Sequence, residues 1–71
     1  MTAAEMDALQ EDIVDETEAA AIARESMRNF RQRRYEGTGP AFIKVGRKPL
    51  YRRSAVLEWM LAHERPSGTP D

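Results

Sequence analysis

The sequence predicts a small α+β domain in which two short helices, a β-hairpin and a final helix follow one another. Three observations predict it: two capped helical segments meet near Ser26, a β-branched and aromatic run follows a glycine- and proline-rich stretch, and an apolar helical pattern comes last. The chain has 71 residues, which allows one domain with a modest core. We expect residues 13–63 to form this domain, between an acidic N-terminal arm (1–12) and a disordered tail (64–71).

The acidic N-terminal arm carries a weak helical pattern. Thr2 and Glu5 have the spacing of a capping box, and Met6, Leu9 and Ile13 recur at helical intervals. Two alternatives stay open. The arm is either frayed, or a helix that packs on the domain or on a neighbouring subunit.

A first domain helix is predicted over residues 16–23. Asp15 and Glu18 stand in the N-cap and N3 positions, and acids in a first turn interact favourably with the helix dipole. Ala19 and Ala20 are small, so another helix can pack closely on this face. A helix this short is marginal alone and needs tertiary contacts.

A second helix is predicted from Ser26 to about Tyr35, after a turn at Arg24 and Glu25. Ser26 is a strong N-cap residue. Phe30 is embedded among polar residues, and we expect it to anchor the helix while the polar side chains stay free for a partner. Two short helices joined this tightly form a helix-turn-helix candidate.

The second helix should stop at residues 36–40, where two glycines and a proline reverse the chain. Residues 42–45 then have strand composition, residues 46–49 form a turn, and residues 50–53 form a second strand. This is a β-hairpin with a basic tip. Pro49 cannot donate a ladder hydrogen bond, so it belongs at the hairpin edge or at the start of the second strand.

The last predicted helix spans about residues 55–63, with Ser54 as its N-cap. We expect this helix to close the core, because it holds most of the large apolar side chains: Val56, Leu57, Trp59, Met60 and Leu61. Tyr51 and Trp59 lie among apolar neighbours and are expected in the core rather than stacked on bases.

The charge of the chain is unevenly distributed. The net charge is only -1 and the isoelectric point is about 5.8. Residues 1–23 nevertheless hold seven acids and no base, whereas residues 24–53 hold ten of the eleven Lys and Arg residues against two acids. The middle of the chain therefore carries a local positive field that the total conceals.

Helix, turn, helix, basic hairpin and helix is the element order of a winged helix-turn-helix. One helix fits a major groove, and a hairpin tip can follow the phosphates or enter the adjacent minor groove. The candidate DNA-binding residues are Arg28, Asn29, Arg31, Gln32, Arg33, Arg34, Lys44, Arg47, Lys48, Arg52 and Arg53. The alternative for each is an ordinary solvated surface.

The roles within this set follow from side-chain chemistry. Arg, Asn and Gln match the edges of guanine and adenine, so Arg28, Asn29 and Gln32 are assigned to bases and Arg31 to a base or a phosphate. Phosphate contact or packing is expected of Arg33 and Arg34. Cations alternate along the two strands, so some of Lys44, Arg52 and Arg53 point away from DNA and pair with Glu36 or Glu58 instead.

Several classes of function find no support in the residues. The chain has no cysteine and a single histidine, His63, expected at the surface, so we expect no metal site and no cofactor. Ser26 and Ser54 are interpreted as helix N-cap residues, and no acid is paired with a histidine, so we expect neither an enzyme nor a small-molecule substrate.

No apolar run approaches the roughly 20 residues of a membrane span, and the N-terminus is acidic where a signal peptide is basic. A soluble, cytoplasmic protein without membrane contact is expected.

Over residues 13–62 the chain resembles the small excisionase-like winged-helix proteins of the MerR-like superfamily. The resemblance is carried by residues 15–20, Ser26, and residues 36–37, 39–47 and 51–60. The chain departs from the family pattern at three places. Arg24 and Glu25 replace a Gly-Val turn, Phe30 replaces a leucine, and Arg33 stands where an aromatic residue is often found.

The resemblance implies a recombination directionality factor. Such a protein binds repeated attachment-site sequences in double-stranded DNA, bends them, and helps a tyrosine integrase excise a phage or integrative element. Neighbouring copies of the chain on DNA would be further partners, and the resemblance implies a nucleoid-associated protein in the bacterial cytoplasm. Two rivals remain: a transcriptional regulator of a mobile element with the same winged helix, and a protein-interaction module that applies its basic face to an acidic partner.

Overall fold

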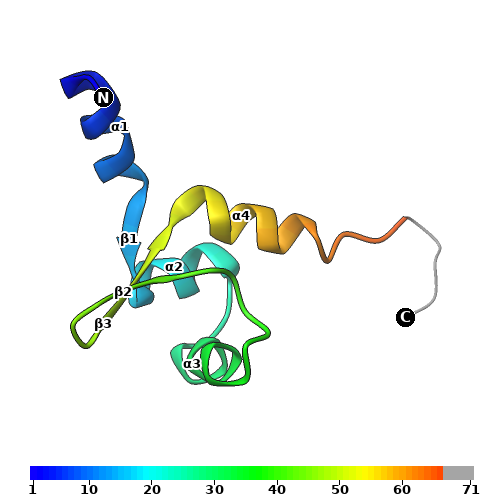
Figure 1. The fold of residues 1–71 in the computed structure, drawn as a ribbon. Coiled ribbons are helices and arrows are strands. Elements are labelled where there is room, and N and C mark those ends of the chain that lie inside the picture. The colour runs from blue at the N-terminus through cyan, green and yellow to red at the C-terminus, as the bar shows by residue number, and fades with distance from the viewer. Residues whose placement is uncertain (67–71) are drawn as a thin grey trace.

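The computed structural model describes residues 1–66 and shows, within them, an α+β fold with four helices and a three-stranded antiparallel sheet (Figure 1). The α+β class expected from the sequence is confirmed. The elements in chain order are α1 (Ala3–Asp12), β1 (Ile13–Asp15), α2 (Glu16–Ala23), α3 (Met27–Glu36), β2 (Ile43–Val45), β3 (Lys48–Arg52) and α4 (Arg53–Leu61). Residues 64–66 have no regular secondary structure, and the rest of the predicted tail, residues 67–71, lies outside the described residues.

The sheet has the order β1-β3-β2, with β3 in the centre. Val14 pairs with Tyr51 on one side of β3, and Ile43 pairs with Leu50 on the other. Strand β1 was not predicted, and the assignment of Ile13 to a helical pattern was wrong, because Ile13 lies opposite Arg52 in the sheet. A three-residue strand is too short to show alternation and exists because β3 supplies its partner.

The ends of α2 and α3 confirm the predicted caps. The Asp15 side chain accepts a hydrogen bond from the Glu18 N–H at 2.8 Å, and Ser26 accepts one from the Asn29 N–H at 3.1 Å. Helix α3 ends at Gly37 in the left-handed region, with φ 74°. Helix α2 ends at Arg24, which has φ 59° and is the one non-glycine residue with positive φ among residues 1–66. Here a conformation that glycine adopts freely is taken by arginine at an energetic cost.

The core lies between the sheet and helices α2, α3 and α4. Phe30 and Tyr51 are each 1% exposed, and their ring centroids are 5.2 Å apart, so their expected core positions are confirmed. Ala19 and Ala20 are buried, as their small size predicted. Trp59 is only partly buried; its ring packs edge-on against Phe30, and its indole N–H donates to the Thr38 carbonyl at 2.9 Å.

The hairpin is tighter than predicted. Strand β3 already begins at Lys48, so only Gly46, with φ 62°, and Arg47 separate the two strands. Residue Pro49 pairs with Lys44 near the beginning of β3, before β1 joins the sheet at Leu50. Pro49 therefore lies outside the part of β3 that is paired on both sides, as expected for a residue without an N–H donor.

Helix α4 begins two residues before the predicted start, and Ser54 is not its N-cap. The N-cap is Arg52, whose side chain makes no capping hydrogen bond. Instead, the N–H and the hydroxyl of Ser54 donate to the Asp12 carboxylate, at 3.0 and 2.7 Å. A carboxylate from the end of α1 thus satisfies an N–H of the first turn of α4. Leu57 and Leu61 are 46% and 65% exposed, so only part of α4 closes the core.

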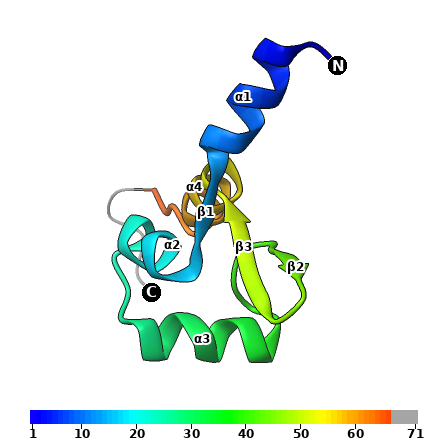
Figure 2. The ribbon, with the colours of Figure 1, turned by 90° about the vertical axis from the view of Figure 1, so that its left-hand side faces the viewer.

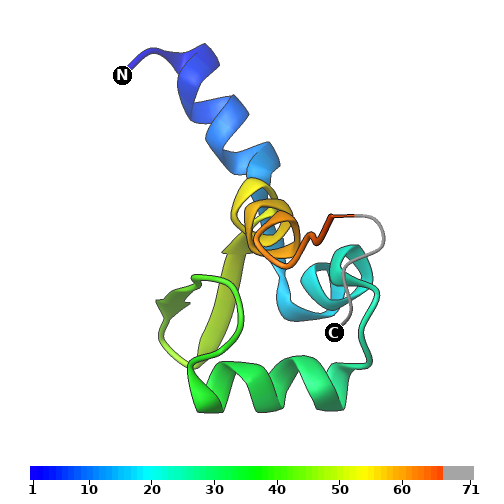
Figure 3. The ribbon, with the colours of Figure 1, turned by 90° about the vertical axis from the view of Figure 1, so that its right-hand side faces the viewer.

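Helix α1 projects from the body at the end opposite α3 (Figures 1, 2 and 3). The predicted capping box between Thr2 and Glu5 is present. No residue of α1 is buried, and Met6 and Leu9 are 51% and 42% exposed. The arm is therefore a helix in this structure, joined to the body through β1 and the contact between Asp12 and Ser54.

Candidate nucleic-acid interface

One side of α3 is polar and open to solvent. The cap at Ser26 begins the helix and Phe30 fixes it against the core. Arg28, Asn29 and Gln32, the three residues assigned to bases, are all exposed. Helix α3 lies along the end of the molecule opposite α1, with no element beyond it (Figure 2). The structure therefore presents these three side chains together on one helix.

A buried carboxylate fixes α3 to the rest of the domain. Glu16, at the start of α2, is 8% exposed. It accepts hydrogen bonds from Arg34 Nε at 2.6 Å and from the Tyr51 hydroxyl at 2.9 Å, and Arg31 Nε lies 3.4 Å from its other oxygen. Burial raises the pKa of the Glu16 carboxyl, but the bonds from Arg34 and Tyr51 outweigh this and hold the pKa below its usual range. Burial and the nearby carboxylate raise the pKa of the Tyr51 hydroxyl.

Arg33 has its own partners inside the domain. Its Nε lies 2.6 Å from a carboxylate oxygen of Glu25, and its guanidinium lies 5.2 Å from the Trp59 ring centroid. The contact with Trp59 has the geometry of a cation–π interaction. Of the two expectations for Arg33 and Arg34, these contacts favour packing over phosphate contact.

The hairpin carries exposed cations beside α3. Lys44, Arg47 and Lys48 are exposed, and Arg47 stands in the turn between the strands. Figure 1 shows the hairpin projecting from the body past α3, which is viewed nearly end on. Lys48 and Arg31 line the same cavity of about 260 Å³, together with Met27. The structure thus brings the start of β3 next to α3.

Arg52 and Arg53 lie elsewhere. They stand where β3 joins α4, and Arg52 pairs with Ile13 at the far end of the sheet from the hairpin turn. The Arg53 side chain forms an ion pair with Glu18 at 3.3 Å rather than with Glu36 or Glu58. The structure does not group these two arginines with the α3 surface.

Three residues at this end of the molecule were missed from the predicted set. Glu16 and Glu25 bind the arginines of α3, and Tyr35 is 74% exposed with the Arg34 guanidinium 4.8 Å from its ring centroid. From the sequence, the acids at the start of α2 are attributed to the helix dipole and Glu25 is assigned to the turn before α3, and neither interpretation indicates an arginine partner. An aromatic residue at the exposed end of a basic helix was the signal that could have identified Tyr35.

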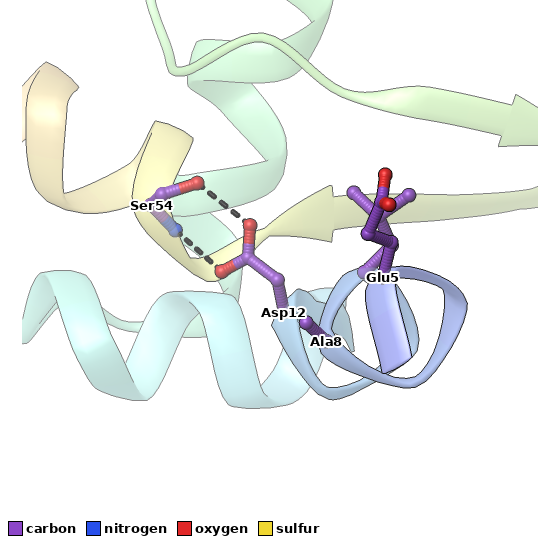
Figure 4. A pocket seen from close by; sticks show the side chains of 5 residues that line it. Glu5, Ala8, Asp12 and Ser54 are labelled. Carbon is purple, nitrogen blue, oxygen red and sulfur yellow. Dashed lines mark hydrogen bonds between the residues drawn. The ribbon is translucent and has the colours of Figure 1, made fainter. Parts of the chain in front are cut away.

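A separate cavity of about 530 Å³ lies between α1 and the start of α4 (Figure 4). It is lined by Glu5, Ala8, Leu9, Asp12 and Ser54. Asp12 and Ser54 are already bonded to each other, and the hydrogen bonds from Ser54 lower the pKa of the Asp12 carboxyl. This cavity therefore offers few free polar groups to a ligand.

The described part of the chain contains no group of three or more His, Cys, Asp or Glu residues that could hold a metal ion. No helix within residues 1–66 is long and apolar enough to cross a membrane.

Comparisons of the chain with models of protein families, with curated proteins and with solved structures found no match. Function is therefore inferred from the geometry of the chain's own residues. The polar face of α3 and the neighbouring hairpin cations are the features that any functional proposal has to explain.

Proposed function

We propose that this chain is a sequence-specific, non-catalytic DNA-binding protein with a winged helix-turn-helix. In this proposal α2 and α3 are the helix-turn-helix, and the β2–β3 hairpin is the wing. One observation carries it: Arg28, Asn29 and Gln32 are exposed together on a helix that Phe30 anchors in the core. These are the side-chain types whose donors and acceptors match base edges in the major groove.

The distribution of charge supports the same orientation on DNA. Exposed cations lie on α3 and on the hairpin, namely Arg28, Arg31, Lys44, Arg47 and Lys48. The acidic α1 lies at the opposite end of the molecule (Figure 3). Arg33, Arg34 and Arg53 are engaged with carboxylates. The proposed phosphate-binding set is consequently smaller than the sequence predicted.

The proposed mechanism divides the work between two elements. Helix α3 enters a major groove and reads bases, while Arg47 and Lys48 hold the neighbouring backbone or minor groove. Bending a short site costs on the order of 1 to 6 kcal/mol, which additional phosphate contacts offset. Following the resemblance, we propose the task of an excisionase, which binds and bends attachment-site DNA so that a tyrosine integrase can excise a mobile element.

Substitutions on α3 test the DNA-binding proposal. Arg28→Ala or Gln32→Ala should weaken binding to a cognate site by about 1 to 3 kcal/mol and relax its sequence preference. By contrast, Arg47→Ala should weaken binding to all sequences similarly and reduce the salt dependence. The matched control is Arg53→Ala, which removes a cation of the same type far from α3 and should leave affinity unchanged. Salt-dependent footprinting and fluorescence anisotropy measure these effects.

The outcomes separate the rival functions. If the Arg28 and Gln32 variants bind the site as well as the parent, α3 is not the recognition helix. An integrase-dependent excision assay, run with and without the protein, distinguishes excision from regulation of transcription by the same DNA-binding surface. A basic surface that serves an acidic protein would instead bind DNA of every sequence equally weakly and leave no footprint at a preferred site.

A further inference from the structure

Glu16 binds two arginines of α3 in unequal ways. Arg34 approaches side-on, with Nε 2.6 Å from one carboxylate oxygen and Nη2 3.4 Å from the other. Arg31 approaches through Nε alone, 3.4 Å from Oε1. The Arg34 side chain is 17% exposed, whereas that of Arg31 is 56% exposed. The same carboxylate therefore has one partly buried and one exposed cationic partner.

The charges of this cluster do not cancel. Arg34 alone neutralises Glu16, and the Tyr51 hydroxyl adds a neutral hydrogen bond at 2.9 Å. The charge of Arg31 is thus in excess of what the buried carboxylate needs. An exposed positive charge that is surplus to a structural ion pair is available to an anionic partner.

The guanidinium geometry of Arg31 specifies what such a partner can be. Guanidinium is a planar fork with five N–H donors, and two parallel bonds from it match the oxygens of a phosphate. Because Nε of Arg31 is turned to Glu16, the edge formed by its two terminal nitrogens is left for another group. Among residues 1–66, Glu16 is the partner that the structure shows for Arg31.

We infer that Glu16 is a positioning residue. It orients Arg31 in the free protein, so that the terminal nitrogens of Arg31 can donate hydrogen bonds to a phosphate of the bound DNA backbone. This inference rests on the proposed function. Lys48 lines the same cavity as Arg31, so the phosphate that Arg31 binds lies where α3 and the hairpin meet. A side chain that is held in place before binding loses less conformational entropy when the complex forms.

Conservative substitutions separate positioning from charge. Binding of a duplex containing the cognate site is measured by fluorescence anisotropy at several salt concentrations. With Arg31→Lys we expect about tenfold weaker binding at an unchanged salt slope, because the ammonium keeps the charge but cannot span both Glu16 and two phosphate oxygens. Arg31→Ala should also reduce the salt slope by about 0.9. The matched control is Arg53→Lys, at an exposed arginine that also pairs with a carboxylate, Glu18, but lies away from the α3 surface, and it should bind like the parent.

A second background tests the role of Glu16 itself. Glu16→Gln combined with Arg34→Met removes the partly buried ion pair as a unit, and proteins often tolerate the joint replacement of both partners. In this background, once circular dichroism shows the parent fold, Arg31→Lys should weaken binding no more than about threefold. If the double variant does not fold, Glu16→Gln alone serves as the second background, because its amide oxygen can still accept hydrogen bonds from Arg34 and Tyr51 while the charge that attracts Arg31 is gone.

Specific results would overturn the inference while leaving DNA binding intact. Parent-like affinity of Arg31→Lys would show that Arg31 acts as a charge without positioning. An equal loss on Arg31→Lys in both backgrounds would show that Glu16 does not position it. Failure of the parent itself to bind any duplex would instead refute the proposed function, and the inference with it.

Discussion

Helices α1 and α3 are both ten residues long and begin with the same capping chemistry, yet they occupy opposite situations. Thr2 caps α1 and Ser26 caps α3, each by accepting a hydrogen bond from the N–H three residues later. No residue of α1 is buried, whereas α3 buries Phe30. Acids dominate α1, and α3 carries four arginines.

The difference between the two helices teaches what local sequence does and does not determine. Caps and composition make both segments helical, but only tertiary contacts fix a helix in place. Phe30, the Glu16–Arg34 pair and the Glu25–Arg33 pair hold α3 at three points. A surface that reads bases needs side chains on such a rigid support. Helix α1 is attached at one end only.

The largest expected effect comes from removing the core contact of α3. Phe30→Ala should lower the free energy of unfolding by about 4 kcal/mol, because it deletes a fully buried ring that packs on Tyr51. The matched substitution in α1, Leu9→Ala, should change it by less than about 0.5 kcal/mol, since Leu9 is 42% exposed. Urea denaturation followed by tryptophan fluorescence measures both. A large loss from Leu9→Ala would show that α1 is packed in solution.

The parts of the fold that depend on nearby residues were predictable from the sequence. Asp15 and Ser26 begin helices and Gly37 ends one because capping acts over three or four residues. The burial of Phe30 and the exposure of Gln32 follow from helical spacing in the same way. These features include most of the candidate base-reading surface.

The parts that depend on distant residues were not predictable. Strand β1 forms only because β3 pairs with it, and Ser54 binds Asp12, which is 42 positions away in the chain. The ion pairs of Arg33 and Arg34 likewise need the packing of α2 on α3 before their partners come into reach. Composition identified a set of cations, but only the fold separates the engaged cations from the exposed ones.

The attachment of α3 through Glu16 should be sensitive to acid. The folded-state pKa of Glu16 lies below its usual value of about 4.5, so its ion pair stabilises the fold above that pH. This stabilisation is lost as the pH falls through the folded-state pKa. We expect the melting temperature to fall with acidification below about pH 4.5. The decrease should be smaller than the one that Phe30→Ala causes, because a protonated Glu16 can still accept a hydrogen bond.

The variant Glu16→Gln with Arg34→Met is the control for this acid effect. It lacks the titrating pair, so its melting temperature should depend less on pH than that of the parent. Some dependence should remain, because Ser54 also lowers the pKa of Asp12 at the base of α1. If the melting temperatures of parent and variant depended equally on pH, the Glu16–Arg34 pair would contribute nothing to the acid sensitivity.

The smallest effect comes from the caps and gives the closest comparison of the two helices. Ser26→Ala should lower the free energy of unfolding by about 1 kcal/mol, because α3 cannot lose its first turn without loosening the core contact of Phe30. Thr2→Ala removes the equivalent bond in α1, but this helix is not coupled to the core, so global stability should stay within about 0.5 kcal/mol of the parent. Amide hydrogen exchange should then show faster exchange confined to α1. If Thr2→Ala instead destabilised the whole domain as much as Ser26→Ala, α1 would be a coupled part of the fold, and the contrast between a fixed basic helix and a loosely attached acidic one would be wrong.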